Sequence, residues 1–162
     1  MTRKSIILLN QDPTRITVKD VMHKAVISVD AASTVNEAAK MMEDAKVGAI
    51  IVTENNTPIG IVTDRDFAVK IVAHAYPITT PVKRIMSSPL IAISPTESVW
   101  MIADLMHTRG IRKLPVIDND KVVGMVTATD LVKQLAISTA DDIHKMYHES
   151  VIKIYEHHSP YS

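Results

Sequence analysis

The sequence contains no cysteine among its 162 residues. This absence excludes disulfide scaffolds, thiolate-bound zinc and cysteine nucleophiles. The sequence also has no surplus of positive or negative charge, because 18 Lys and Arg residues balance 18 Asp and Glu residues. A protein that coats nucleic acid needs a basic surplus, so a nucleic-acid partner is not expected, although the balance leaves room for a local basic patch.

Long apolar runs are missing as well. The apolar stretch 6–9 is shorter than the core of a signal peptide, and the longest other run is 47–52. Both are far below the roughly 18 residues that span a bilayer. Hydrophobic residues make up 46% and charged residues 22%, which is typical of a globular domain. We therefore expect a cytoplasmic protein with no membrane insertion.

An internal repeat dominates the sequence. When the chain is shifted by 64 positions, residues 18–72 align with residues 82–136 without a gap. Thirteen of the 55 aligned pairs are identical, whereas unrelated segments of average composition would share roughly three. We therefore predict a tandem duplication, with an N-terminal extension at 1–17, a first domain at 18–74, a linker at 75–81, a second domain at 82–136 and a helical tail at 137–162.

Each copy has the same expected order of elements, which is strand, helix, strand, strand, helix. The segment Thr34–Glu37 has the spacing of a capping box and predicts the start of a helix, and Gly110 predicts the end of its counterpart. Turn residues at 54–56 and 118–120 predict two hairpins. The expected strands are 25–29, 49–53 and 59–62 in the first copy and 90–93, 114–117 and 122–126 in the second, with further helices starting near Thr63 and Thr127.

These elements predict a mixed fold of the α/β (α+β) class. Neither copy, at about 55 residues, can bury much of a core alone. We therefore expect two pseudo-symmetric β-α-β-β-α repeats that pack sheet to sheet. No Gly-x-Ser-x-Gly elbow, P-loop or His-Glu-x-x-His motif is present, so we do not expect an enzyme.

Three sets of motifs give the chain a family resemblance. The two copies start with the similar segments Val18–Met22 and Val82–Met86. They end with the similar segments Gly60–Asp66 and Gly124–Asp130. Together with the central segment Gly110–Val116, these motifs resemble a pair of cystathionine-β-synthase (CBS) domains, the unit called a Bateman module. The resemblance implies clefts between the two copies that bind AMP, ADP, ATP or S-adenosylmethionine. It also implies a stand-alone regulatory protein that senses energy state, has no permanent cofactor and acts on an unknown client.

The pairs Thr63/Asp66 and Thr127/Asp130 admit two compatible interpretations. Each is a capping box, in which the threonine and the carboxylate satisfy free N–H groups at a helix start. The same geometry suits a ligand, because free amides at a helix start favour phosphate. A carboxylate there can also accept the two hydroxyls of a ribose.

The resemblance implies which residues line each cleft. In the first cleft, apolar residues would sandwich the adenine, Asp66 would accept the ribose, and Arg65, Arg112 and Lys113 would meet phosphates. The residues of this first cleft are Ile61, Thr63, Arg65, Asp66, Leu90, Ile91, Ile111, Arg112, Lys113 and Pro115. The residues of the second cleft are Val26, Ile27, Val47, Gly48, Ala49, Ile51, Met125, Thr127, Thr129 and Asp130.

The two clefts differ in their expected charge. Gly48 and Ala49 stand where the second copy has Arg112 and Lys113, and Thr129 stands where the first copy has Arg65. Charge-assisted bonds to phosphate are about twice as strong as neutral ones. An adenine nucleotide is therefore expected to bind first, and more tightly, in the Asp66 cleft.

A homodimer is the expected assembly. The helix faces that carry Val35, Met42, Val99 and Met106 are expected to be exposed in a single chain and covered by a second one. The tail from Asp141 onward is expected to pack across the partner or on the rim. His144 and His148 are four residues apart, but no third ligand has convincing spacing, so no metal site is expected.

Two other function classes stay open. The protein could be a structural or interaction dimer whose clefts bind no ligand. It could also bind nucleic acid through the Lys and Arg residues next to the linker and through the pair Arg112-Lys113. Affinity for AMP or ATP would distinguish the first class from a nucleotide sensor, and a salt-dependent shift with RNA or DNA would indicate the second.

Overall fold

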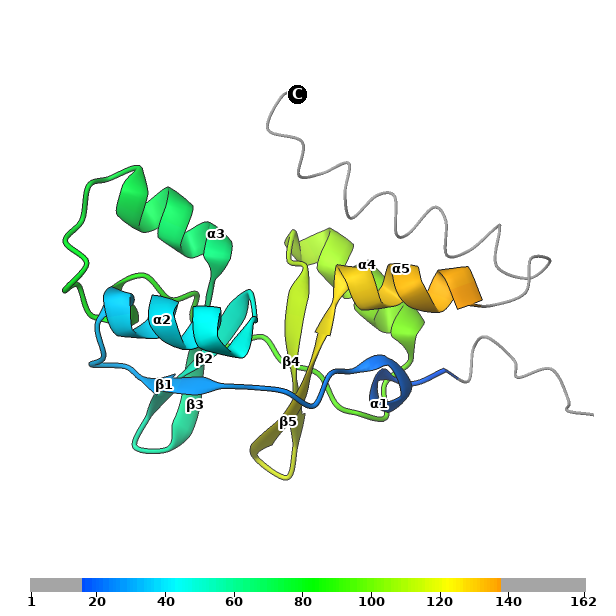
Figure 1. Ribbon diagram of the computed structural model, residues 1–162. Coiled ribbons are helices and arrows are strands. Elements are labelled where there is room, and N and C mark those ends of the chain that lie inside the picture. The colour runs from blue at the N-terminus through cyan, green and yellow to red at the C-terminus, as the bar shows by residue number, and fades with distance from the viewer. Residues whose placement is uncertain (1–15, 138–162) are drawn as a thin grey trace, which may run out of the picture. The chain divides into compact units, whose positions relative to one another are not determined.

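The computed structural model describes residues 16–137, with side chains up to position 134. This part of the chain forms two compact units, and Figure 1 shows the elements of each. The helical unit comprises 16–21, 95–112 and 128–137, and the sheet unit comprises 22–94 and 113–127. The helical unit holds α1 (Val18–Val21), α4 (Val99–Arg109) and α5 (Ala128–Ile137). The sheet unit holds β1 (Ser28–Asp30), α2 (Val35–Ala45), β2 (Ala49–Glu54), β3 (Thr57–Thr63), α3 (Asp64–Asp66), the π-helix η2 (Phe67–Val72), the 3-10 helix η3 (Val82–Arg84), β4 (Lys113–Asp118) and β5 (Lys121–Thr127).

The sheet unit contains both predicted hairpins, which the structure confirms. Strands β1, β2 and β3 form one sheet, with β1 parallel to β2, while β4 and β5 form an antiparallel pair. The turns between the strands have positive φ at Asn55 and Asn56, and again at Asn119 and Asp120. Asn and Asp tolerate this left-handed conformation, which a two-residue hairpin turn requires. The expected mixed α and β fold class is therefore confirmed.

Helix α2 begins as the capping box predicts. The Thr34 N–H donates to Glu37 Oε2 at 2.7 Å, and the Glu37 N–H donates to Thr34 Oγ1 at 3.2 Å. The bonds from Thr34 lower the pKa of Glu37 below its ordinary value. The helix packs on the β1–β2–β3 sheet, as Figure 1 shows, and shares one core with it. That core contains Val29, Ala31, Val35, Ala38, Met42, Ile50, Val52, Val62, Ile71, Val82 and Ile85.

Helices α2 and α4 end at the same position of the repeat, but the residue at that position differs between the two copies. Gly110 ends α4 with φ of 63°, as the sequence predicts, and Lys46 ends α2 with φ of 53°. The two positions correspond in the repeat. A residue with a Cβ atom pays about 1–2 kcal/mol for the left-handed conformation, whereas glycine adopts it freely.

Lys46→Gly should therefore stabilise the protein. Relief of the left-handed strain exceeds the extra unfolded-state entropy of glycine, so the free energy of unfolding should rise by about 0.5–1 kcal/mol. Urea denaturation of both proteins measures this change. Gly110→Ala is the matched reverse change and should destabilise. A decrease in stability for Lys46→Gly would contradict the argument.

The first strand of the second copy is not formed as expected. Residues 90–93 were predicted as a strand, but only Ile93 forms an isolated parallel bridge, to Val116. Pro89 and Pro95 flank the segment, and proline cannot donate a backbone hydrogen bond to a sheet. In the first copy, the strand expected at 25–29 is observed at Ser28–Asp30, where it pairs with β2.

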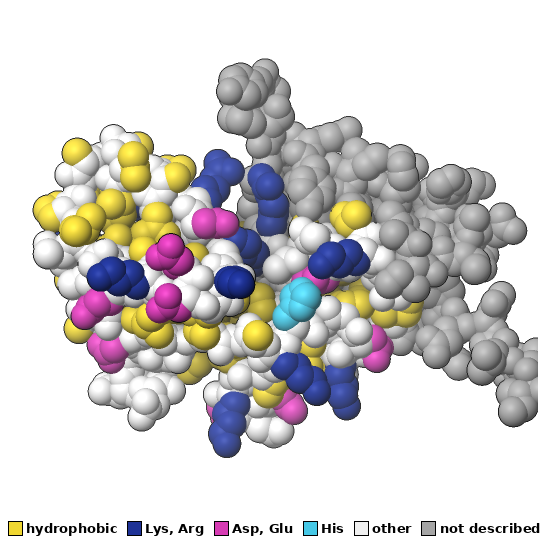
Figure 2. Space-filling model, viewed as in Figure 1, with side chains coloured by type: hydrophobic (Ala, Val, Ile, Leu, Met, Phe, Trp, Pro, Cys, Tyr) yellow, Lys and Arg dark blue, Asp and Glu magenta, His cyan; other side chains and the backbone are white. Residues whose placement is uncertain are grey.

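The helix faces expected to be exposed are buried within the chain. Val35, Met42, Val99 and Met106 are between 0% and 6% exposed, because the apolar stripe of each helix packs on the chain's own core. The expectation of a dimer through these residues is therefore wrong, and the homodimer itself stays a prediction. Large exposed apolar residues gather instead on η2 and the connector after it, where Figure 2 shows a hydrophobic cluster. These residues are Val69, Val72, Tyr76 and Ile78.

In the helical unit, the chain around α1 is bonded to the segment that leads into α4. The Val18 N–H donates to the Glu97 carbonyl at 2.9 Å, and the Val99 N–H donates to the Ile16 carbonyl at 3.1 Å. Within residues 16–137, no helix is long and apolar enough to cross a membrane. The expected tail packing falls on residues outside the described part of the chain.

Candidate ligand site at the start of α3

The strand β3 turns into α3 at Thr63, and this junction fixes the carboxylate of Asp66. The Thr63 N–H donates to Asp66 Oδ2 at 2.8 Å, and the Thr63 hydroxyl donates to the same oxygen at 2.7 Å. Asp66 is 9% exposed, so its carboxylate is held in one orientation in a nearly buried position. The capping-box interpretation of Thr63 and Asp66 is thus confirmed.

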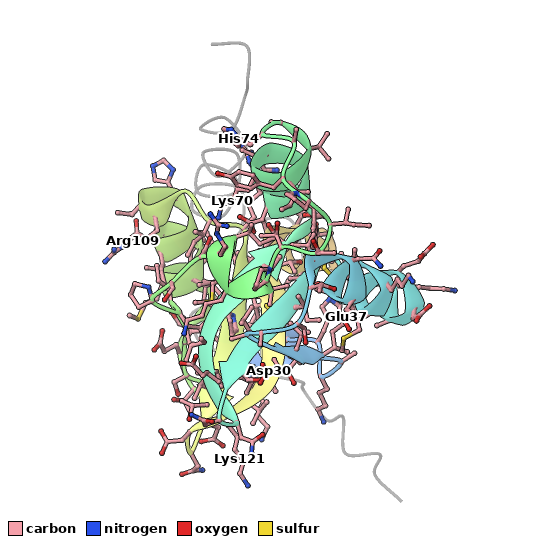
Figure 3. The ribbon with its side chains drawn as sticks, turned by 90° about the vertical axis from the view of Figure 1, so that its left-hand side faces the viewer. Asp30, Glu37, Lys70, His74, Arg109 and Lys121 are labelled. Carbon is pink, nitrogen blue, oxygen red and sulfur yellow. The ribbon has the colours of Figure 1, made fainter. Side chains whose placement is uncertain are left out.

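Lys70 holds the second oxygen of Asp66. Its ammonium lies 2.8 Å from Asp66 Oδ1 and donates to the Ile85 carbonyl at 2.6 Å. Figure 3 labels Lys70 on the helix that follows β3. An ionised carboxylate offers about four acceptor positions, and Thr63 and Lys70 together use three of them. Asp66 can therefore accept a further hydroxyl without losing its present partners.

A second lysine lies close to the start of α3. The Lys113 ammonium donates to the Gly48 carbonyl at 2.6 Å and to Asp64 Oδ1 at 3.0 Å. The Asp64 N–H donates to the same Gly48 carbonyl at 3.2 Å. A Cβ atom on Gly48 would lie 2.8 Å from both Asp64 Oδ2 and Lys113 Nζ, so glycine leaves room for this pair.

Lys113 and Gly48 were expected to lie in different clefts, but the structure brings them into contact. Lys113 is therefore not an unpaired cation, as its assignment to phosphate assumed. Arg65 is exposed, and its side chain forms no ion pair with any residue of the described part of the chain. Arg112 belongs to the helical unit.

The sequence did not predict a close backbone contact that lies beside Gly60 and is repeated beside Gly124. Ile61, beside Gly60, exchanges both backbone hydrogen bonds with Ser87, at 3.1 and 2.9 Å. Met125, beside Gly124, does the same with His23, at 2.8 Å for each bond. The segment after each repeat-starting motif therefore lies on the outer edge of a hairpin. Its signal in the sequence was the identity of the repeated glycines and of Met22 and Met86.

The other predicted site residues fall in both units. The helical unit contains Ile111, Arg112, Thr129 and Asp130, and the sheet unit contains the rest. Asp130 is 5% exposed, much like Asp66, whereas Thr129 is exposed. Ile51, Pro115 and Met125 are buried. The half-buried members are Val26, Ile27, Val47, Gly48, Ala49, Ile61, Thr63, Leu90, Ile91, Ile111, Arg112, Lys113 and Thr127.

The second copy repeats the backbone of the junction with different side chains. The Ala128 N–H donates to the Arg112 carbonyl at 2.9 Å, as the Asp64 N–H does to Gly48. Alanine replaces the acid at the start of the helix, and Gln134 stands where the first copy has Lys70. In residues 16–137, no group of three or more His, Asp or Glu side chains could hold a metal ion.

The repeats, the hairpins and the two Thr-x-x-Asp junctions agree with a known family. A model of the CBS domain matches the chain twice, over residues 18–73 and 82–137. The chain therefore belongs to the CBS domain family and carries two such domains in tandem.

Particular members of the family resemble the chain over most of its length. CBS domain-containing protein YhcV of Bacillus subtilis is 38% identical over 125 residues, which span 76% of this chain and 89% of YhcV. The solved CBS domain of NE2398 is 31% identical with a TM-score of 0.69, covering 76% of this chain and 98% of that one. The CBS domain pair of protein MJ0100, solved with 5′-methylthioadenosine and S-adenosyl-L-methionine, is 27% identical with a TM-score of 0.68. That match covers 75% of this chain and 96% of MJ0100.

Proposed function

We propose that the protein binds an adenosine-containing ligand at the start of α3 and regulates a partner through it. The observation that carries the proposal is the Asp66 carboxylate, which is almost buried and is oriented by Thr63 and Lys70. A carboxylate held in this way is pre-organised, so a ribose hydroxyl can bind without the entropy cost of ordering the side chain. The remaining acceptor position of Asp66 receives that hydroxyl.

A relative supports the chemical class of the ligand. The CBS domain pair of MJ0100 was solved with 5′-methylthioadenosine and S-adenosyl-L-methionine, and both molecules contain an adenosine group. They differ in the group on the 5′ carbon, so the part they share is the adenine and its ribose. The ribose belongs to this shared part, and a buried acceptor such as Asp66 can recognise its hydroxyl groups.

The second Thr-x-x-Asp junction is proposed as a weaker site. Asp130 is buried like Asp66 and follows an equivalent backbone. Its surroundings lack the repeat-equivalents of Arg65 and Lys70, because Thr129 and Gln134 occupy those positions. We assign the protein a regulatory rather than a catalytic role, acting as a homodimer on a client.

Calorimetric titration with AMP, ADP, ATP, S-adenosylmethionine, 5′-methylthioadenosine and NADH tests this function. We expect at least one of them to bind. Ligand at 100 times its dissociation constant should stabilise the fold by about 2.7 kcal/mol, which raises the melting temperature. If no adenosine compound binds at millimolar concentration, the proposed function is wrong.

A further inference from the structure

The start of α3 contains two acids, and each is paired with a lysine. Asp66 is paired with Lys70 at 2.8 Å, and Asp64 is paired with Lys113 at 3.0 Å. Arg65, between the two acids, is the exposed cation of the segment. Of the two cations that the sequence assigned to phosphate and that lie in the sheet unit, Arg65 is therefore unpaired within the described residues and Lys113 is paired.

The pair formed by Asp64 and Lys113 is held in place by the backbone. Two donors of the Lys113 ammonium are directed to the Gly48 carbonyl and to Asp64. The side chain of Lys113 is 25% exposed, and that of Asp64 is 68% exposed. An ammonium has three donors, so a ligand phosphate could use the third, but the neighbouring carboxylate would repel that phosphate.

Only the first copy has an acidic residue at the position of Asp64. Its counterpart in the repeat is Ala128, so the duplicated fold does not require a carboxylate at this position. Asp64 follows Thr63, whose N–H and hydroxyl hold the Asp66 carboxylate, so the Asp64–Lys113 pair and Asp66 belong to the same junction. Adenosine compounds differ in the group on the 5′ carbon, so a charge at this junction can favour one 5′ group over another.

We propose that Asp64 is a specificity-determining residue that makes the Asp66 site select adenosine ligands with an uncharged or singly charged 5′ group over ATP. By pairing with Lys113, it withholds one cation from a phosphate chain and adds a negative charge near it. This inference rests on the proposed function of Asp66. It changes the sequence-based expectation, in which Lys113 favoured phosphate.

The test compares Asp64→Asn with the control Asp44→Asn. Both changes remove one negative charge, but Asp44 is exposed on α2 and forms no ion pair within the described residues. Titrations with 5′-methylthioadenosine, AMP and ATP at low salt are made on the full chain, since salt screens exposed charges. For Asp64→Asn, affinity for ATP should rise about tenfold, the usual effect of one charge-assisted hydrogen bond. Affinity for 5′-methylthioadenosine should change less than about twofold.

A second variant shows whether the effect acts through Lys113. Adding Lys113→Met to Asp64→Asn should remove most of the gain for ATP, which a double-mutant cycle measures. An equal ratio of ATP to 5′-methylthioadenosine affinity in Asp64→Asn and Asp44→Asn would overturn the inference while leaving the proposed function intact. If the unaltered protein binds none of the adenosine compounds at millimolar concentration, the proposed function is wrong and the inference is overturned with it.

Discussion

Replacing Asp66 with alanine should weaken the binding of an adenosine-containing ligand by about 1.5–3 kcal/mol, the usual contribution of a hydrogen bond to a charged group. The variant removes the acceptor for the ribose hydroxyl. It also releases Lys70, which now lies 2.8 Å from Asp66. Calorimetry on the variant and the unaltered protein measures the loss.

Two controls separate binding from folding in this experiment. Asp66→Ala also removes the partner of the Thr63 N–H, which costs about 1 kcal/mol of stability, so its melting temperature is measured alongside. Lys70→Met leaves the carboxylate and its bonds to Thr63 in place, and it should weaken binding much less than Asp66→Ala. If both variants lose the same affinity, Asp66 acts as part of the ion pair and not as the ribose acceptor.

Asp130→Ala provides the comparison between the two repeats. It should cost much less affinity at low ligand concentration, because Thr129 and Gln134 replace the cations that accompany Asp66. Asp130 is as buried as Asp66, so burial alone would not produce this difference. If Asp130→Ala abolishes binding while Asp66→Ala is harmless, the charges near each junction do not determine which site binds the ligand more tightly.

Local signals in the sequence predicted the elements correctly where a few adjacent residues determine the backbone. The capping box at Thr34–Glu37 and the left-handed turns at Asn55 and Asn119 depend on contacts within four residues. Because the sequence repeats, an element predicted in one copy could also be predicted at the equivalent position of the other. This prediction was wrong for the strand at 90–93, because Pro89 and Pro95 replace residues that can donate to a sheet in the first copy.

The charge balance of the candidate site could not be obtained in the same way. Lys113 and Asp64 are 49 residues apart, and Lys113 and Gly48 are 65 apart, so no local pattern indicates their contact. From its motif alone, Lys113 was expected to be free to bind phosphate. The structure places its ammonium between a carboxylate and a carbonyl, which changes the ligand that the site should prefer.

Gly60→Ala should destabilise the protein by about 1–3 kcal/mol, the usual cost of overpacking a site that cannot relax. A Cβ atom on Gly60 would lie 2.9 Å from the Ser87 carbonyl and 2.7 Å from Met86 Sδ. The carbonyl is fixed by its bond with Ile61, so the whole segment after η3 would have to move. Urea denaturation measures the loss in the free energy of unfolding.

Two other glycines make this prediction specific. Gly124 has the same contacts, with His23 carbonyl at 2.9 Å and Met22 Sδ at 2.7 Å, so Gly124→Ala should cost a similar amount. Gly48→Ala meets only the ends of two side chains, at 2.8 Å, and these ends can rotate away. Its cost should stay below about 1 kcal/mol, since the disturbed ion pair has an exposed partner in Asp64 and can shift toward solvent. Equal losses at Gly48 and Gly60 would show that the edge contact does not hold the repeat-starting segment on its hairpin.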